Sequence, residues 1–218
     1  MTSIGIQKKL KVNVSGPTGS GKSTLVKLMA LHPGVHAIPE HQPVDLLRRF
    51  DAEPYAHCFE LQRTILSARF DKPVGDAAWV RLQDRSPEED IAVFAAMFYT
   101  AGYLSSLQLT KLSELARSVS AVSGAADAFV LLTAERRVLE QRVRAAGAPN
   151  IVLDLLDEQI QLYHQWFDSL TGPRIVINTS SLDLEALASR GAWILSSITS
   201  ACARQPARNT ALDLAWIL

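Results

Sequence analysis

The sequence predicts an α/β fold in which a parallel sheet is covered by helices on both faces. Two observations predict it: short apolar runs recur along the chain, and helical patterns, with apolar residues about three and four apart, separate most of them. Strands that alternate with helices run parallel, because the chain crosses over a helix before it begins the next strand. The chain has 218 residues, 48% of them hydrophobic, so we expect a single domain over residues 1–218.

The first strand is predicted at Leu10–Ser15, where apolar and polar residues alternate before a glycine-rich loop and the helix-forming stretch "KSTLVKLMALH". The other strands are predicted at the short apolar runs Val35–Ile38, Trp79–Leu82, Phe129–Leu132 and Ile175–Ile177. Further helices are predicted at Pro54–Phe70, Pro87–Thr100, Tyr103–Ser120, Ala134–Ala146, Ile151–Leu170 and Leu182–Ser197. The tail, about 203–218, changes character, and we expect either a docked helix or a mobile terminus there.

The composition of the chain argues against a nucleic-acid partner, a disulfide framework and a membrane span. With 22 basic and 22 acidic residues the formal net charge is zero, which argues against a nucleic-acid partner and favours a small substrate. The two cysteines, Cys58 and Cys202, lack the spacing of a metal site or a disulfide framework, so we expect ordinary thiols in a reducing compartment. No apolar run approaches the ~20 residues that span a bilayer. The expected protein is soluble and cytoplasmic, without a membrane partner.

The stretch "GPTGSGKST" has the spacing of a phosphate-binding loop between a strand and a helix. Its glycines let backbone N–H groups approach phosphate oxygens, the lysine adds charge at the β and γ phosphates, and a hydroxyl reaches Mg²⁺. The alternative is a glycine-rich turn without a ligand. We therefore predict ATP and Mg²⁺ as ligands, with ATP contacts from Gly16, Pro17, Thr18, Gly19, Ser20, Gly21, Lys22, Ser23 and Thr24.

Two acidic residues follow predicted strands. Asp84, in "WVRLQDRS", stands where a P-loop site requires a carboxylate, so we predict that it holds the metal with Ser23. The alternative for Asp84 is a helix N-cap or a surface ion pair. Glu40 follows "HAIP", and since parallel strands open their carboxyl ends onto one crevice, it should face the same region and accept a proton from an attacking hydroxyl. Its alternative is a solvated loop residue.

The order and spacing of several stretches resemble the deoxynucleoside kinase family over nearly the whole chain. They are "GPTGSGKST", Glu40 followed by "PVD", "DAEPYAHCFELQRTILSARF", "DRSPEED", "ADAFVLLTAERRVLEQRVRAAG", "LDLLDEQIQLYHQWF" and "GPRIVINTSSLDLEAL". The resemblance implies a P-loop kinase-like, three-layer α/β fold with a five-stranded parallel sheet of order 2-3-1-4-5. It also implies transfer of the γ-phosphoryl group of ATP to the 5′-hydroxyl of a nucleoside, by a homodimer.

The resemblance also implies roles for single residues. Glu40 matches the general base, Arg85 matches the arginine near that base and the transferring phosphoryl group, and Asp84 replaces the family's usual glutamate. Gln62 matches the glutamine that pairs with the nucleobase edge, and Arg69 and Asp90 match the residues that complete that pocket. Gln62 and Arg69 are seven residues apart and so share a helix face. Taken singly, each is open to the alternative of a surface polar residue on an amphipathic helix.

The chain departs from the family in two places. In the lid region, about 142–151, the sequence reads "RVRAAGAPN": Arg142 matches the first lid arginine, while Ala146 and Ala148 stand where two more are expected. Arg144 or Arg137 is a possible substitute, and we predict ATP contacts from Arg142 and Arg144. At the sugar site Asp51 replaces the usual tyrosine and is predicted to accept a hydrogen bond from the substrate hydroxyl.

These departures keep two alternatives to a nucleoside kinase open. One is a nucleotide-binding regulatory protein that has the kinase fold but little or no catalysis, because lid arginines neutralise charge in the transition state of phosphoryl transfer. The other is a kinase of a nucleotide or of another small hydroxylated metabolite, since the loop is shared by such enzymes and only the acceptor pocket differs.

Overall fold

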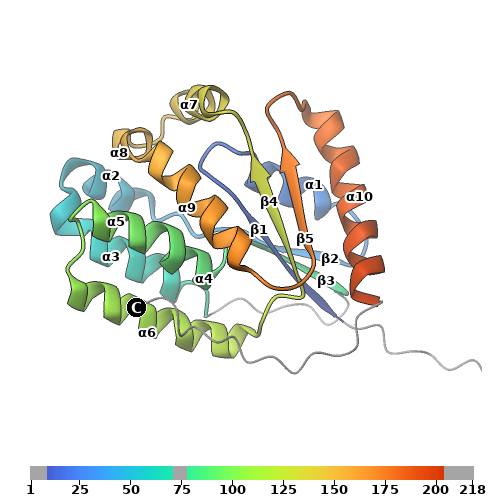
Figure 1. Cartoon of the computed structure of the whole chain (residues 1–218), viewed down its shortest axis with the longest axis horizontal. Coiled ribbons are helices and arrows are strands. Elements are labelled where there is room, and N and C mark those ends of the chain that lie inside the picture. The colour runs from blue at the N-terminus through green and yellow to red at the C-terminus, as the bar shows by residue number, and fades with distance from the viewer. Residues whose placement is uncertain (1–8, 71–77, 204–218) are drawn as a thin grey trace, which may run out of the picture.

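The computed structural model describes residues 9–70 and 78–203, and its centre is one five-stranded parallel sheet (Figure 1). The strand order is β2-β3-β1-β4-β5, as the resemblance implies. The strands are β1 (Leu10–Ser15), β2 (Val35–Ile38), β3 (Val80–Asp84), β4 (Ala128–Thr133) and β5 (Arg174–Asn178). All five predicted strands are therefore confirmed, with ends shifted by one or two residues in the last three.

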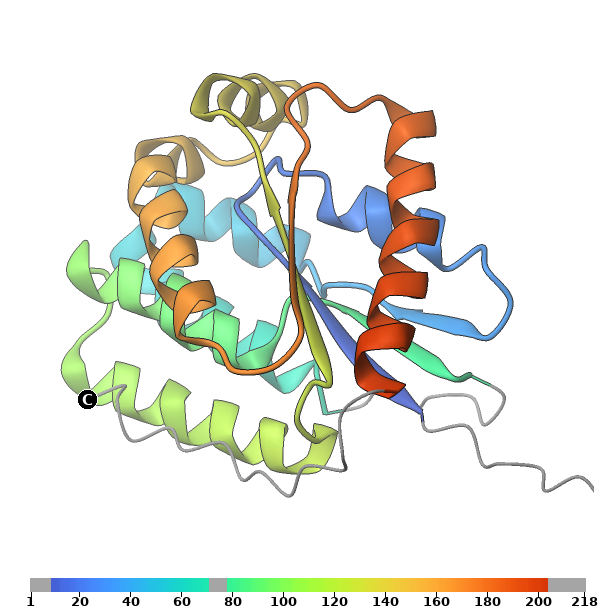
Figure 2. The ribbon, with the colours of Figure 1, turned by 45° about the vertical axis from the view of Figure 1, so that its right-hand side comes forward.

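Helices cover both faces of this sheet, which gives the predicted three layers (Figures 1 and 2). On one face α1 (Lys22–Met29) and α10 (Leu184–Ala203) pack against the sheet and bury side chains such as Val12, Val14 and Ile194. On the other face Phe129 and Leu131 of β4 pack against α9 (Leu156–Ser169) and the short helices that follow β3. Alternate residues of each strand point to opposite faces, so every central strand contributes to both layers.

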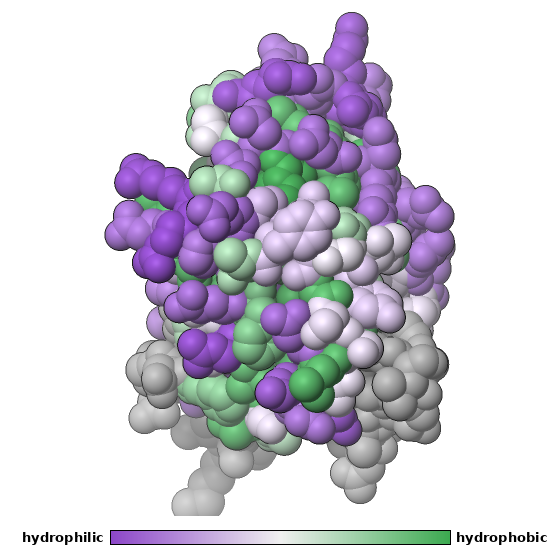
Figure 3. Space-filling model, turned by 90° about the vertical axis from the view of Figure 1, so that its left-hand side faces the viewer, coloured by the Kyte–Doolittle hydropathy of each residue, from purple (hydrophilic) through white to green (hydrophobic). Residues whose placement is uncertain are grey.

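A second apolar cluster lies beyond the sheet, among the helices at the left of Figure 1. It joins α2 (Val44–Ala52), α3 (Pro54–Ser67), α5 (Ala96–Thr100), α6 (Ser106–Ser123) and α8 (Asn150–Asp154). Seen from that side, apolar side chains reach the surface among hydrophilic ones (Figure 3). Helix α2 was not predicted, and its nine residues bury only Leu46 and Phe50.

Two predicted helices are interrupted in the structure. Pro87–Thr100 is divided into α4 (Pro87–Glu89), a π-helical stretch η1 (Asp90–Ala95) and α5. π-helical turns are rare and often occur at functional sites, and this one begins at Asp90. The predicted helix Ile151–Leu170 is interrupted at Leu155, which separates α8 from α9.

The carboxyl ends of all five strands lie at one edge of the sheet, where the segments after β1, β2 and β3 meet. Helix α7 (Arg136–Ala145) and α8 lie beyond the same edge, so the lid region faces the phosphate-binding loop (Figures 1 and 2). None of the helices within the described residues is long and apolar enough to cross a bilayer. The predicted tail falls, from residue 204 on, outside the described residues.

Candidate active site

The phosphate-binding loop, residues 16–24, joins β1 to α1 and adopts a backbone that depends on glycine. Gly16, Gly19 and Gly21 have φ angles of +142°, +83° and +92°. A Cβ atom on Gly16 would lie 2.2 Å from the carbonyl oxygen of Leu132, so the loop passes closer to β4 than any side chain would permit. The positive φ angles and this close approach explain the glycines of the motif.

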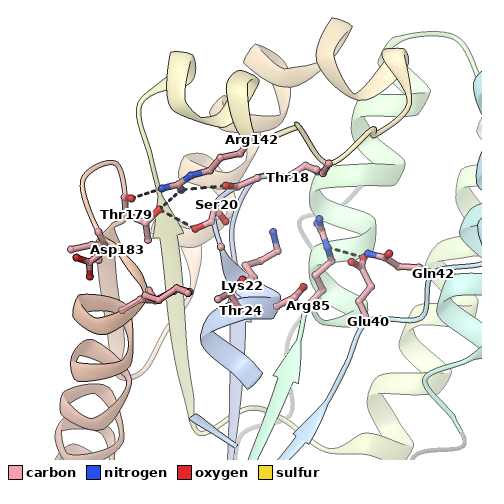
Figure 4. Close-up of a pocket in the computed structure, with 17 residues that line it drawn as sticks. Thr18, Ser20, Lys22, Thr24, Glu40, Gln42, Arg85, Arg142, Thr179 and Asp183 are labelled. Atoms are coloured by element: carbon pink, nitrogen blue, oxygen red, sulfur yellow. Dashed lines mark hydrogen bonds and ion pairs between the residues drawn. The ribbon is translucent and has the colours of Figure 1, made fainter. Parts of the chain in front are cut away.

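A cavity of about 540 Å³ opens beside this loop (Figure 4). Its volume is in the range of small-molecule sites. Figure 4 shows Glu40 and Arg85 on one side of the loop and Arg142 and Thr179 on the other. The lining residues are Thr18, Gly19, Ser20, Gly21, Lys22, Ser23, Thr24, Glu40, Gln42, Arg85, Arg142, Ala146, Thr179, Leu182, Asp183, Leu184 and Leu187.

Lys22 is a buried cation at the floor of the cavity. Its side chain donates a hydrogen bond to the Pro17 carbonyl oxygen at 2.9 Å, and only 5% of the residue is exposed. Burial and the charge of Arg85 together lower the pKa of Lys22 to about 8, against nearby carboxylates that raise it. A bound anion would favour the charged ammonium, so this lysine is suited to binding phosphate.

Ser23 and Asp84, which the sequence predicts as metal ligands, lie in direct contact. The Ser23 hydroxyl donates to Asp84 Oδ2 at 2.6 Å, whereas Asp84 Oδ1 is buried and has no hydrogen-bond partner among the described residues. A hydroxyl and a carboxylate with a spare oxygen are the hard donors that Mg²⁺ takes, with phosphate oxygens and water completing its shell. Within residues 9–70 and 78–203 no three His, Cys, Asp or Glu side chains form a metal site by themselves. These residues therefore fit a metal held jointly with a nucleotide.

Glu40 and Arg85 form a close ion pair on the wall opposite Arg142. Arg85 Nε lies 2.7 Å from Glu40 Oε1, and the two side chains are 6% and 16% exposed. Burial raises the pKa of Glu40, but the charges of Arg85 and Lys22 outweigh it, and the pKa of Glu40 is lowered from its usual value. Glu40 is thus a carboxylate at neutral pH, with an oxygen available to accept a proton.

Glu89 and Tyr163 also contact Arg85, although neither was among the predicted site residues. Arg85 Nη1 donates to the Tyr163 hydroxyl at 2.6 Å, and that hydroxyl donates to Glu89 Oε1. The other Glu89 oxygen accepts a hydrogen bond from the Ser15 hydroxyl at 2.6 Å. Glu89 lies within the "DRSPEED" stretch, which was a signal for it, but nothing in the sequence indicates that Tyr163 lies beside it.

Glu89→Gln is expected to remove part of the pH dependence of the free energy of unfolding. Burial raises the pKa of Glu89 from 4.5 to about 7, against Arg85, Ser15, Tyr163 and Lys22, which lower it. Because the folded pKa lies above the unfolded one, Glu89 contributes stability that is present below about pH 4.5 and is lost as the pH rises through about 7.

Urea denaturation at about pH 5 and at about pH 8 measures this. Between these two pH values the free energy of unfolding of the wild type should fall by about 1–3 kcal/mol more than that of Glu89→Gln. Glu114→Gln, at an exposed position on α6, is the control. Equal losses in the wild type and Glu89→Gln would contradict the raised pKa.

Arg69 and Asp90, two of the residues predicted for the nucleobase pocket, form a buried bidentate ion pair. Arg69 Nε and Nη2 donate to the Asp90 carboxylate at 2.7 and 3.0 Å, and Arg69 Nη1 donates to the Arg85 carbonyl oxygen at 3.2 Å. Gln62 is also buried and makes no side-chain hydrogen bond with a described residue. None of these three lines the 540 Å³ cavity, and Arg69 adjoins it only through its hydrogen bond to the backbone of Arg85.

The remaining predicted residues differ in position. Arg142 lines the cavity, where it donates to the Thr179 carbonyl oxygen at 2.8 Å and to the Gly19 carbonyl oxygen at 3.3 Å. Arg144 is exposed, pairs with Glu140 at 2.8 Å and does not line the cavity. The Asp51 carboxylate, predicted for the sugar site, accepts a long 3.5 Å hydrogen bond from the backbone N–H of Ile151 and lies outside the cavity lining.

Comparisons with known proteins bear on the family and the fold of the chain. A family model described as deoxynucleoside kinase matches residues 12–203. A structure of deoxyadenosine kinase from M. mycoides with products dCMP and a flexible dCDP bound has a TM-score of 0.72 and 18% identity, covering 87% of this chain and 100% of that chain. A structure of the same kinase with bound dCTP has a TM-score of 0.71 and 17% identity, covering 86% and 100%. The two structures establish the likeness of fold. A search of curated proteins gives no match.

Proposed function

Because the chain belongs to the deoxynucleoside kinase family of nucleoside phosphotransferases, we propose that it transfers the γ-phosphoryl group of ATP to a nucleoside 5′-hydroxyl. The observation that carries the proposal is the Glu40–Arg85 ion pair in the wall of the cavity that also contains Lys22. A carboxylate base and two cations around one cavity are the groups that in-line transfer between a bound triphosphate and a hydroxyl requires.

In the proposed reaction Glu40 accepts the proton of the 5′-hydroxyl while that oxygen forms its bond to the γ phosphorus. The bond from the γ phosphorus to the bridging oxygen breaks, ADP leaves with the electron pair, and the proton on Glu40 returns to solvent. Lys22 and Arg85 neutralise the charge that builds up on the phosphoryl oxygens. Arg85 already balances Glu40, and this keeps the pKa of Glu40 low enough for the carboxylate to be present throughout the neutral range.

Ser23 and Asp84 would hold Mg²⁺, since they bring a hydroxyl and an unpaired carboxylate oxygen to the loop. When bound, the metal neutralises phosphate charge and orients the triphosphate. The phosphate-binding loop, residues 16–24, contacts ATP in this proposal, and Arg142 is the lid cation beside it.

The acceptor is proposed to lie on the Glu40 side of the cavity, with its base toward Gln62. Gln62 is buried and its carboxamide has no hydrogen-bond partner among residues 9–70 and 78–203, so both its donor and its acceptor are available to a base edge. The Arg69–Asp90 pair adjoins this region through the Arg85 carbonyl oxygen, and Asp51 is proposed to accept a hydrogen bond from the sugar.

A nucleotide-binding regulatory protein is the second candidate, because of a specific feature of the lid. Ala146 lines the cavity where a lid arginine is expected, and Arg144 is paired with Glu140 outside the cavity. Under this alternative ATP binds, but turnover is no faster than in a variant without Lys22. A third possibility, a kinase of a nucleotide or of another small hydroxylated metabolite, keeps the loop and differs only in the acceptor.

We also propose a homodimer in the cytoplasm. Exposed apolar residues on the helices beyond the sheet, Tyr99 of α5 and Leu107 of α6, support a partner surface there. Cys58 is buried and forms no disulfide with a described residue, which supports a reducing compartment.

Incubation of the purified protein with ATP, Mg²⁺ and a panel of nucleosides tests the proposal. A nucleoside 5′-monophosphate is the expected product, and Lys22→Ala should reduce its rate of formation to background. ATP binding without monophosphate from any nucleoside would overturn the kinase proposal and favour the regulatory protein. A product formed only from a nucleotide or another metabolite would favour the third possibility.

A further inference from the structure

Helix α9 has two polar side chains on one face, and each makes a hydrogen bond to a different part of the active site. Gln159 Oε1 accepts a hydrogen bond from the backbone N–H of Thr18 at 2.7 Å, and the Tyr163 hydroxyl accepts one from Arg85 Nη1 at 2.6 Å. Residues four apart lie one above the other on a helix. One buried helix face therefore touches both the phosphate-binding loop and the arginine that pairs with Glu40.

Arg85 needs such support because its backbone is strained. Its φ is +66°, a left-handed conformation that costs a non-glycine residue free energy and persists only where its surroundings hold it. The Arg85 N–H donates to the Val14 carbonyl oxygen at 3.0 Å, and the Arg85 carbonyl oxygen accepts from Arg69 at 3.2 Å. These bonds fix the turn but leave the long side chain to be oriented by other contacts.

Besides a longer 3.5 Å contact with Glu89, three contacts orient the guanidinium of Arg85. Nε faces Glu40, Nη1 donates to Tyr163, and the ring of Phe94 lies 4.3 Å from Cζ. Nη2 makes no hydrogen bond with any residue that the structure describes, and Arg85 lines the cavity. Without the Tyr163 hydroxyl, Nη1 would retain only the 3.5 Å contact with Glu89.

Tyr163 is anchored in turn. Its hydroxyl donates to Glu89, which is fully buried and also accepts a hydrogen bond from Ser15. Ser15 is the last residue of β1 and immediately precedes the loop at Gly16. The path from Arg85 through Tyr163 and Glu89 thus ends on the strand that carries the phosphate-binding loop.

We propose that Gln159 and Tyr163 are positioning residues that set the placement of the phosphate-binding loop and of Arg85 relative to each other. Gln159 acts through Thr18 on the donor phosphates, and Tyr163 acts through Arg85 on the transferring phosphoryl group. The inference rests on the proposed kinase function. Holding both groups from one rigid helix reduces the misplacement that costs rate in phosphoryl transfer.

Tyr163→Phe is the test of the acceptor side. We expect kcat to fall by about 10–100-fold, with KM for ATP within about twofold, because Arg85 is present but no longer oriented. Exchange of the Arg85 Nε–H with solvent, measured by NMR and assigned with an Arg85→Lys variant, should be faster. Tyr103→Phe is the control, since the Tyr103 hydroxyl makes no hydrogen bond with a described residue. Unchanged exchange, or equal kcat values in the two variants, would overturn the role of Tyr163.

Gln159→Leu is the test of the donor side. The affinity for ATP without acceptor, measured by calorimetry, should fall about tenfold, because Thr18 loses its hydrogen bond. Gln161→Leu, at an exposed amide on the same helix, should bind ATP as the wild type does. If both variants bind equally, Gln159 has no positioning role. If the wild type phosphorylates no nucleoside, the proposed function fails, whereas ATP affinity and Arg85 exchange still decide this inference.

Discussion

Glu40→Gln is expected to lower kcat by about 10²–10⁴-fold, the usual contribution of a positioned general base. The amide has nearly the shape of the carboxylate, but it cannot accept the proton of the attacking hydroxyl. Arg85 keeps its hydrogen bond to Tyr163 and its contact with Glu89, so the remainder of the site should persist. The affinity for ATP is therefore expected to stay within a few-fold of the wild type.

Steady-state kinetics with the best nucleoside of the panel, together with calorimetric ATP binding, measures both effects. Glu60→Gln, at an exposed position on α3, is the matched control and should behave as the wild type. Turnover at the wild-type rate in Glu40→Gln would refute the assignment of Glu40 as base. A parallel loss of ATP affinity would show instead that the ion pair with Arg85 is needed to build the donor site.

Asp90→Asn is expected to destabilise the fold by about 3–5 kcal/mol, because it leaves the buried Arg69 without its counter-charge. Arg69 and Asp90 are only 7% and 2% exposed, and two hydrogen bonds join them. Chemical denaturation measures the change. Asp157→Asn is the control. It breaks the ion pair between Arg136 and Asp157, whose side chains are 47% and 75% exposed, so a much smaller loss of stability is expected than for Asp90→Asn.

The double variant Arg69→Met/Asp90→Leu distinguishes the contribution of this ion pair to fold stability from its contribution to nucleoside binding. Replacing both charges with apolar side chains removes the unpaired charge, so much of the stability should return. Nucleoside binding should not return if the pair completes the base pocket as proposed. Recovery of both stability and nucleoside affinity would show that the pair is only structural. An Asp90→Asn variant as stable as Asp157→Asn would contradict the buried ion pair itself.

Local patterns were sufficient for the strands and the phosphate-binding loop. The four short apolar runs and the alternating stretch Leu10–Ser15 predict strands because the sheet faces that helices cover must be apolar, and the structure has a strand at each of the five places. The glycine positions of "GPTGSGKST" follow from backbone geometry that only glycine adopts freely, as the φ angles of Gly16, Gly19 and Gly21 show. Asp84 and Glu40 follow their strands directly, so sheet topology alone brought them to the same edge.

The helices that lack a strong local signal were predicted poorly. Helix α2 is short and mostly exposed, and it buries Leu46 and Phe50 only because α3 and α6 provide a surface for them. The π-helical stretch at Asp90 breaks the predicted helix Pro87–Thr100, whose sequence contains no glycine and no proline after Pro87. Such breaks depend on buried contacts such as the Arg69–Asp90 pair, which propensity does not contain.

The sequence by itself therefore determined the strands, the glycine-rich loop and the acidic residues at the strand ends, because each depends on neighbours in the chain. Only the tertiary structure decided which polar side chains meet. It paired Arg85 with Tyr163, which is 78 positions away, and directed Arg144 to Glu140 rather than into the cavity. The direction of a side chain from a helix depends on the phase of that helix against the sheet, and packing over the whole chain fixes that phase.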